Sequence, residues 1–211
     1  MSDRPLIIAI DGPSASGKGT LAKRLADHFG LPHLDTGLLD RAVGWMAERT
    51  GRSPSEIASG LRAEDVDNPE LKGDEAGQAG SRVAAIPEVR ANLLNFQRNF
   101  AYQQAGAVLD GRDIGTVICP DAPVKLFVTA SPEARAERRY QELRERGVDT
   151  IKPRVLAEMA ERDRRDSERA AAPLKAAPDA YLLDTSDMDA DAAFAAALAF
   201  IAGKGFRSAG P

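Results

Sequence analysis

The residues best suited to chemistry form a glycine-rich stretch at positions 12–20, which reads Gly-Pro-Ser-Ala-Ser-Gly-Lys-Gly-Thr. It follows an apolar run at residues 6–10 and precedes a helical pattern in which apolar residues recur at every fourth position from 21 to 29. A strand, a glycine-rich loop and a helix in this order are the context of a phosphate-binding P-loop. Backbone N–H groups of such a loop converge on an anion, and the helix N-terminus adds partial positive charge. The pattern therefore predicts binding of nucleotide phosphates, with Lys18 reaching the β- and γ-phosphates.

The P-loop departs from the general motif at one position. Most P-loops carry Ser or Thr directly after the lysine to hold Mg²⁺, whereas here Gly19 follows Lys18 and Thr20 supplies a hydroxyl one position later. We therefore expect the metal to be held partly through water.

Three further stretches carry polar residues in patterns that suggest a site, namely residues 35–41, 109–116 and 161–169. In the last of them, Arg162, Asp166 and Arg169 share one helix face, at i, i+4 and i+7. Taken alone, a charged helix is usually a solvated surface with internal ion pairs. Phosphoryl transfer, however, requires several cations around the transferring group, and Arg is favoured for bidentate contact. A P-loop supplies only one lysine, so an arginine-rich helix that closes over the site and excludes water is a natural source of the rest.

The elements that must position these residues alternate between short apolar runs and helical patterns. The runs predicted as strands lie at residues 6–10, 32–34, 107–109, 124–128 and 181–183. Continuous apolar runs are typical of strands buried on both faces, so the fold class is α/β, a three-layer sandwich with a parallel five-stranded sheet. The runs end at the polar residues Asp11, Asp35, Asp110, Thr129 and Asp184. Since ligands bind at the carboxyl ends of parallel strands, these positions are expected near the P-loop.

Residues 51–80 differ from the rest, because they are rich in Gly, Pro, Asp, Glu and Ser and show little apolar periodicity. We interpret them as a small helical or irregular insertion. A long helix follows, from Val83 or Pro87 to Gln104, whose aromatic residues are expected to pack in the core. Further helices are predicted from Ser131, as N-cap, to Gly147, from the end of a loop at 148–153 to about Ala170, and over residues 191–202.

Composition narrows the class of protein. The 211 residues are 43% hydrophobic and 28% charged, with a net charge of −4, which favours neither nucleic acid nor membrane as a partner. The single cysteine, Cys119, fits a reducing compartment, and the two histidines form no metal-binding pattern. No signal peptide and no run long enough to span a bilayer are found, so we expect a cytoplasmic protein and, by default, a monomer.

From about residue 7 to residue 201 the chain resembles the bacterial cytidylate kinases, members of the P-loop nucleoside monophosphate (NMP) kinase superfamily. The motifs that carry the resemblance lie at residues 10–20, 35–37, 81–90, 110–117, 120–122 and 162–174. The P-loop alone marks only the superfamily, whereas residues 81–90 and Gly111-Arg112-Asp113 are specific to the family. The resemblance implies a phosphotransferase that uses ATP and Mg²⁺ to convert CMP or dCMP into CDP or dCDP.

The resemblance also implies a role for individual residues. The ATP phosphates would be held by Gly12, Pro13, Ser14, Ala15, Ser16, Gly17, Lys18, Gly19 and Thr20, with Arg138 and Arg139 against the base and phosphates. The cytosine would face Ser81, Arg90 and Asp113, the acceptor ribose Thr36, Arg162 and Asp166, and the acceptor phosphate Arg41, Arg112 and Arg169. The catalytic cations would be Lys18, Arg112, Arg162 and Arg169. Thr20 and Asp110 would lie on the metal side and act through water.

The resemblance further implies a single kinase domain over residues 1–211. Residues 5–50 and 106–203 would form its core, residues 51–105 an NMP-binding insertion with its following helix, and residues 146–170 a small lid. The insertion is shorter than usual for the family and lacks the alternating pattern of the family's small antiparallel sheet.

A second departure from the family is Asp40, which stands just before Arg41 where the family commonly has Tyr. A carboxylate beside an acceptor phosphate weakens binding unless Arg41 or another cation neutralises it.

Two other functions remain open from the sequence. One is a P-loop kinase of another small acceptor, such as UMP or a sugar acid. The other is a regulator that binds ATP or GTP without transferring phosphate to a small molecule. A guanine-reading Asn-Lys-x-Asp element is absent from the sequence, and the regulator would leave the arginine-rich helix without a role.

Overall fold

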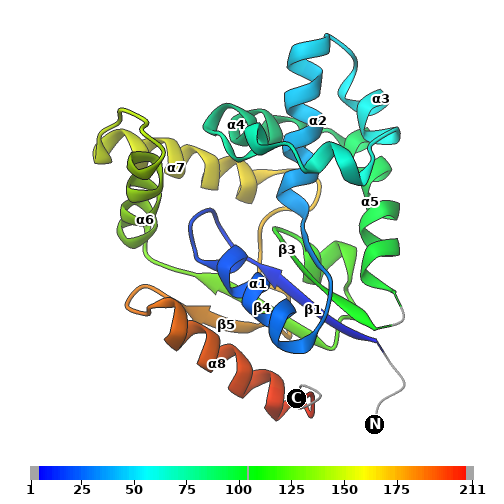
Figure 1. Ribbon diagram of the computed structural model, residues 1–211, viewed down its shortest axis with the longest axis vertical. Coiled ribbons are helices and arrows are strands. Elements are labelled where there is room, and N and C mark those ends of the chain that lie inside the picture. Colours follow the sequence, from blue (N-terminus) through cyan, green and yellow to red (C-terminus); the bar gives the residue numbers. More distant parts are fainter. Residues whose placement is uncertain (1–4, 104, 208–211) are drawn as a thin grey trace.

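Five parallel strands form the central sheet of the computed structural model, which describes residues 5–103 and 105–207 (Figure 1). Their order across the sheet is β2-β3-β1-β4-β5. The strands are β1 (Leu6–Asp11), β2 (His33–Asp35), β3 (Gly106–Gly111), β4 (Val124–Thr129) and β5 (Tyr181–Asp184). The five strand positions expected from the sequence are therefore confirmed.

Helices cover both faces of this sheet, as the three-layer prediction requires. Along β1, Ile7 and Ala9 point into one core and Ile8 and Ile10 into the other, because successive side chains of a strand alternate in direction. The first core is closed by α2 (Thr36–Thr50) and α5 (Pro87–Ala101). The second is closed by α1 (Lys18–Phe29) and α8 (Ala190–Gly203). No described helix combines the length and apolar character needed to cross a membrane.

The strand register brings the polar strand ends together. Asp35 pairs in register with Asp110, and Asp110 pairs with Ile10, one residue before β1 ends. β1 lies between β3 and β4, so the P-loop that follows it emerges at the centre of the carboxyl edge. The sheet itself thus places the P-loop beside the two carboxylates.

The insertion after α2 consists of short helices joined by irregular segments. It contains α3 (Pro54–Ser59), the 3-10 turns η1 (Ala63–Val66) and η2 (Pro69–Lys72), and α4 (Asp74–Val83). The next helix, α5, begins at Pro87, one of the two predicted starts, and ends at Ala101; Gln104 lies outside the described residues. Phe96 and Phe100 of α5 pack against the core, which confirms their predicted place.

Two glycines let α2 and α4 pack backbone to backbone. A Cβ added at Gly44 would lie 2.6 Å from the carbonyl carbon of Ala79, and one at Gly80 would lie 2.9 Å from the backbone nitrogen of Arg41. Real side chains do not fit at such distances, so this close packing depends on glycine. It holds the α2 residues Asp40 and Arg41 against the α4 residue Ser81.

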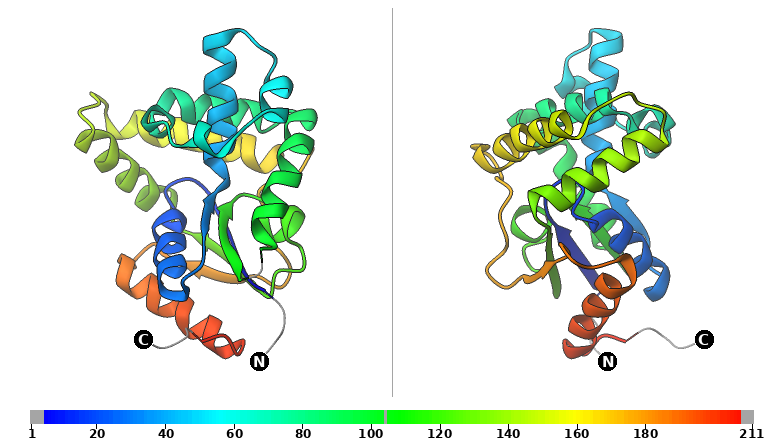
Figure 2. Two further views of the ribbon diagram at one scale, coloured as in Figure 1. Left: turned by 45° about the vertical axis from the view of Figure 1, so that its right-hand side comes forward. Right: turned by 90° about the vertical axis from the view of Figure 1, so that its left-hand side faces the viewer.

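Two helices, α6 (Pro132–Glu145) and α7 (Lys152–Glu168), follow β4, and α7 makes up most of the predicted lid at residues 146–170. The Ser131 hydroxyl accepts the N–H of Ala134 at 3.2 Å, which confirms the predicted N-cap. α6 packs on α7 through Ala136, Leu143, Val155 and Met159. Because α7 begins at Lys152, the loop expected at 148–153 is shorter by two residues. Figure 2 shows α7 running alongside α4, so the lid meets the insertion.

A buried carboxylate fixes the segment after β3. The two oxygens of Asp11 accept the backbone N–H groups of Ile114 and Gly115, at 2.7 and 2.8 Å. These residues begin η3 (Ile114–Ile118), a π-helical turn that the sequence did not predict. Burial raises the pKa of Asp11 to about 7. The clamp orients the residues just before the turn, Arg112 and Asp113, toward the carboxyl edge of the sheet.

We expect Asp11→Asn to destabilise the fold by about 1–3 kcal/mol, because the amide nitrogen would face a backbone N–H and leave it unsatisfied. Urea unfolding measures the change. Asp121→Asn, at an exposed turn before β4, is the matched control and should change stability by less than about 0.5 kcal/mol. Equal stabilities for the two variants would show that Asp11 does not clamp the turn.

Candidate active site

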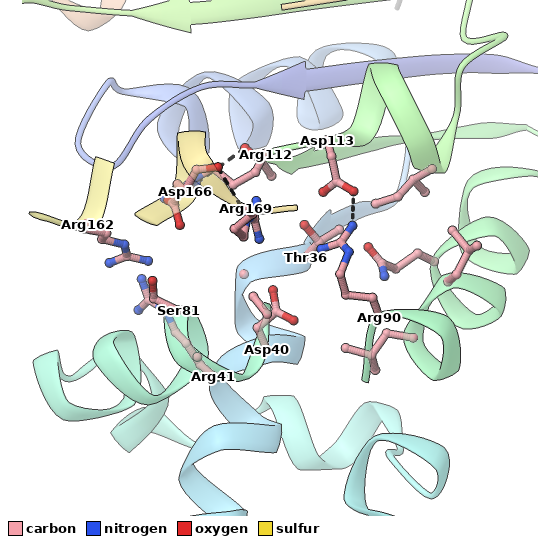
Figure 3. A pocket seen from close by; sticks show the side chains of 18 residues that line it. Thr36, Asp40, Arg41, Ser81, Arg90, Arg112, Asp113, Arg162, Asp166 and Arg169 are labelled. Atoms are coloured by element: carbon pink, nitrogen blue, oxygen red, sulfur yellow. Dashed lines mark hydrogen bonds and ion pairs between the residues drawn. The ribbon is translucent and has the colours of Figure 1, made fainter. Parts of the chain in front are cut away.

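A cavity of about 660 Å³ opens between α2, α4, α5, the end of β3 and α7 (Figure 3). It is lined by every residue that the sequence assigned to the acceptor nucleotide: Thr36, Arg41, Ser81, Arg90, Arg112, Asp113, Arg162, Asp166 and Arg169. These residues come from segments more than a hundred positions apart, and the fold gathers them around one space. Their contacts with a ligand remain predictions.

One ion pair joins the two halves of this cavity. The Arg112 Nε donates to Asp166 Oδ2 at 2.8 Å, and the two side chains are 15% and 5% exposed. Although burial alone would raise the pKa of Asp166, the guanidinium groups of Arg112 and Arg162 hold it below its usual range. The pair ties α7 to the end of β3, so the lid helix and the sheet share one charged contact.

Other cations of the cavity have unsatisfied donors. Arg162 Nε and Arg169 Nη2 are buried and have no hydrogen-bond partner within the described part of the chain. Burial, together with the positive charge of Arg112, lowers the pKa of Arg162 to about 10. Burial also lowers the pKa of Arg169 and of Arg41. Buried donors normally find partners, so unsatisfied guanidinium groups that repel one another indicate a site for an anion.

A hydrogen-bond donor, Arg90, and an acceptor, Asp113, lie next to each other at the other end of the cavity. Arg90 of α5 forms an ion pair with Asp113, the residue before η3, and the two side chains are 17% and 7% exposed. A guanidinium beside a carboxylate can bind a planar group that offers the complementary acceptor and donor. Figure 3 shows Ser81 on the other side of the cavity from this pair, and its contact with the base remains a prediction.

Asp40 lines the cavity. The sequence analysis expects Arg41 or another cation to neutralise its carboxylate. Arg41 does not fill that role, because its Nη1 donates to the carbonyl of Leu71 at 3.0 Å. Burial raises the pKa of Asp40 to about 7, and the cations that oppose this are Arg90 and Arg169.

The P-loop places its lysine, Lys18, within electrostatic range of the cavity residues Arg112 and Arg162. Lys18 Nζ donates to the carbonyl of Pro13 at 3.3 Å. Burial, followed by repulsion from Arg112, lowers the pKa of Lys18 to about 7. The positive φ angles of Ala15 and Gly17, 57° and 88°, curve the loop backbone. A phosphate anion bound in this loop would restore the full charge of Lys18.

Carboxylates next to Lys18 fit a divalent cation. Burial and the neighbouring Asp110 raise the pKa of Asp35. The two carboxylates repel each other, and a bound cation would relieve this repulsion. His33 Nε2 lies 2.8 Å from Asp110 Oδ2 and orients that side chain. Hard oxygen donors suit Mg²⁺, which usually keeps several waters and binds nucleotide phosphates as well. Within residues 5–103 and 105–207, no three His, Cys, Asp or Glu side chains are grouped so that they could hold a metal ion.

Thr20, the other predicted metal-side residue, lines a different pocket. This second pocket, of about 640 Å³, lies on the far side of the P-loop and includes Ser16, Gly17 and Arg138. Its walls are partly apolar, with Leu21, Val128 and Met188. A pocket of this kind beside the P-loop suits the base of ATP.

The two arginines assigned to ATP, Arg138 and Arg139, lie in different pockets. Arg138 lines the second pocket and donates to the Thr185 hydroxyl at 3.0 Å, which in turn donates to the carbonyl of Ser16 at 3.0 Å. Arg139 instead pairs with Glu142 at 2.8 Å and lies near Ser14 and Arg162. Only Arg138 is thus positioned toward an ATP base.

The sequence reasoning missed Arg135. Its guanidinium donates to Asp163 at 2.7 Å and to the carbonyl of Ser14 at 3.3 Å, and so ties the lid helices to the P-loop. The spacing of Arg135, Arg138 and Arg139 on one helix face was the available signal.

Two contacts between lid and insertion were missed as well. Arg165 donates to the Gln78 side chain at 2.8 Å, and Arg146 donates to the carbonyl of Lys72. No sequence pattern signals them, because they depend on how α7 and the end of α6 meet the insertion.

Comparison with known proteins agrees with this geometry. The profile of the cytidylate kinase family matches residues 8–63 and 52–202. The chain is 59% identical to a cytidylate kinase of Paramagnetospirillum magneticum, covering 94% of this chain and 98% of that protein. It is 60% identical to a cytidylate kinase of Xanthobacter autotrophicus, covering 93% and 97%. The chain belongs to the cytidylate kinase family.

Solved structures support the fold of this family member. A protein from Eubacterium ventriosum matches with a TM-score of 0.57, 20% identity and coverage of 96% of this chain and 99% of the other. TT1252 from Thermus thermophilus matches with a TM-score of 0.52, 20% identity and coverage of 97% and 100%. Shikimate kinase from Bacteroides thetaiotaomicron matches with a TM-score of 0.50, 12% identity and coverage of 95% and 99%. At these identities the likeness shows the fold alone.

Lys18→Met should lower kcat by at least about a hundredfold, because one positioned cation is lost from the phosphate site. The free protein should not be destabilised. Burial lowers the pKa of Lys18, so keeping its charge costs stability below about pH 7, and this cost disappears as the pH rises toward 10.5. Thermal unfolding from pH 6 to pH 10, beside kinetics, checks both statements. An unfolded variant, or one with normal turnover, would contradict the assigned role.

Arg169→Ala should lower kcat more than it raises the KM for ATP. The reason is that the unsatisfied donor of Arg169 would bind the negative charge that develops in the transition state of phosphoryl transfer. Steady-state kinetics at saturating acceptor measures the two effects. Arg164→Ala, on the exposed face of α7, is the control and should leave kcat unchanged. If the two variants behave alike, Arg169 belongs to the solvated face of the helix.

Proposed function

We propose that this member of the cytidylate kinase family transfers the γ-phosphate of ATP to CMP or dCMP, giving ADP and CDP or dCDP, in pyrimidine nucleotide metabolism. The observation that carries the proposal is the content of the acceptor cavity. Beside a P-loop, one space holds unsatisfied guanidinium donors at one end and an Arg–Asp pair at the other. A nucleoside monophosphate is the acceptor class that needs both ends.

The ATP side is assigned to the P-loop. Its backbone N–H groups and Lys18 would hold the β- and γ-phosphates, while the second pocket beside Arg138 would hold the adenine. The low pKa of Lys18 in the free protein means that its charge is completed by the phosphates it binds. The nucleotide and the lysine therefore stabilise each other.

The acceptor phosphate is assigned to Arg41, Arg112 and Arg169. One of its oxygens attacks the γ-phosphorus, and the bond from that phosphorus to the β–γ bridging oxygen breaks, leaving ADP. Charge shifts among the oxygens during this step, and guanidinium groups that are already positioned need no reorganisation to stabilise it. Arg162, which lies between the cavity and Arg139, supplies a further cation on the transferring side.

Mg²⁺, when bound, would neutralise part of the charge of the ATP phosphates. Asp110, oriented by His33, and Asp35 would hold it through its waters, with Thr20 on the opposite side of the loop.

Water must be excluded while the phosphoryl group moves, because it competes as an acceptor. The contacts of Arg165 with Gln78 and of Arg146 with Lys72 join the lid to the insertion over the cavity. We assign these contacts to the closed form of the site.

The two other functions fit the cavity less well. A kinase of a sugar acid has no use for the buried Arg90–Asp113 pair, and a regulator has none for the unsatisfied arginines of the acceptor site. The division into core, insertion and lid, the monomeric state and the cytoplasmic location remain predictions.

Base choice supplies the sharpest test of this function. Cytosine presents an exocyclic amine donor beside the N3 acceptor, and uracil presents the reverse. Asp113 suits the amine, and Arg90 suits the N3 and O2 acceptors. With UMP both contacts become repulsive or unpaired, at roughly 1–3 kcal/mol each, so kcat/KM should favour CMP by at least about tenfold.

The measurement is coupled ADP release with CMP, dCMP, UMP and AMP, in the wild type and in Asp113→Asn and Arg90→Met. Both variants should narrow the gap between CMP and UMP, mainly by harming CMP. Equal efficiency for CMP and UMP in the wild type would refute the base-reading pair. An unchanged ratio in the variants would assign base reading to other residues.

A further inference from the structure

The acceptor cavity contains one carboxylate whose partner is missing. Asp113 pairs with Arg90 and Asp166 with Arg112, but in the described part of the chain no hydrogen bond or ion pair reaches the Asp40 side chain. Figure 3 shows Asp40 rising from α2 into the middle of the cavity. Its neighbour Arg41 is directed to the Leu71 carbonyl instead. An unpaired carboxylate in a site built for an anion needs a physical account.

The charged groups that act on Asp40 come from three of the segments that border the cavity. α5 contributes Arg90, the residue before η3 is Asp113, and the end of α7 contributes Asp166 and Arg169. α4, which packs against α2, presents Gly80 and Ser81 and no charge. Arg90 is already paired, so Asp40 obtains only partial compensation. Burial accordingly raises the pKa of Asp40 to about 7, with Arg90 and Arg169 opposing the rise and Asp113 and Asp166 adding to it.

Binding of an acceptor nucleotide brings two negative charges into the same cavity. These charges engage Arg169, one of the two cations that partly compensate Asp40, and they repel an ionised carboxylate. The simplest relief is for Asp40 to take one proton from solvent and become a neutral acid. The protonated side chain then offers an O–H donor, as a tyrosine at this position would.

We propose that Asp40 is an acceptor-site residue that takes up a proton when CMP binds, so that the affinity for CMP depends on pH through this side chain. The inference rests on the proposed function. It requires no atom other than the proton, which comes from the solvent and returns to it when the product leaves.

The direction of the effect follows from linkage. Below about pH 7 Asp40 is protonated in the free protein and binding costs nothing extra. Above it, each binding event must draw a proton, so the KM for CMP rises with pH. Asp40→Asn resembles the protonated acid at every pH and should lack this rise. The ratio of wild-type to variant KM should therefore grow by about tenfold between pH 6 and pH 8.

The experiment measures KM and kcat for CMP at saturating ATP and Mg²⁺ from pH 6 to pH 9, in the wild type, Asp40→Asn and Asp121→Asn. Asp121→Asn removes a carboxylate at the opposite edge of the sheet and should follow the wild type. Calorimetry of CMP binding alone, at pH 7.5 in buffers of different ionisation enthalpy, counts protons. The wild type should take up more protons per CMP than Asp40→Asn, while ionisation of the CMP phosphate contributes equally to both.

Parallel pH profiles and equal proton uptake in the wild type and Asp40→Asn would overturn the proposal, even if the protein phosphorylates CMP normally. A protein that does not phosphorylate CMP at any pH would instead refute the proposed function. A KM ratio that is large but independent of pH would also overturn the inference, because it would make Asp40 a simple packing or hydrogen-bonding residue.

Discussion

The buried ion pair between Arg112 and Asp166 is the contact on which the rest of the site depends. It connects the loop after β3 with the end of the lid helix, and both side chains are almost fully removed from water. Breaking a buried pair on one side leaves an uncompensated charge and typically costs about 3–5 kcal/mol. Asp166 also interacts electrostatically with Arg112, Arg162 and Arg169. Its negative charge therefore offsets part of the repulsion among these three guanidinium groups. The pair is therefore structural and electrostatic at once.

Several charged groups around this pair do not contribute to the stability of the folded protein. Donors of Arg162 and Arg169 are buried without partners, Lys18 loses much of its charge to burial, and Asp35 is disfavoured by Asp110. Each of these groups is destabilising in the free protein and is relieved by phosphate or by a divalent cation. Local conflicts of this kind are expected where a sequence serves a ligand rather than stability.

The fold tolerates these unfavourable buried charges because two apolar cores stabilise the rest of the domain. Both faces of the sheet are closed by apolar helices, and the site occupies only the carboxyl edge. Glycines at 44 and 80 bring α2 and α4 into close contact, so that residues of the insertion and of the core helix line one cavity. Arg135 of α6 contacts the P-loop at the carbonyl of Ser14 and α7 at Asp163, so one side chain joins the three segments.

The sequence by itself determined the strands, the P-loop and the capped helices, because these depend on local periodicity and on turn chemistry. Its resemblance to a family named the residues that the fold gathers around one cavity. The π-helical turn held by Asp11 was not predictable, since its cause is a carboxylate a hundred positions away. The pairing of Arg90 with Asp113, the separation of Arg138 from Arg139 and the isolation of Asp40 were likewise decided by tertiary structure. A sequence specifies which charges exist, but their protonation and pairing depend on burial and distance, which only the folded chain sets.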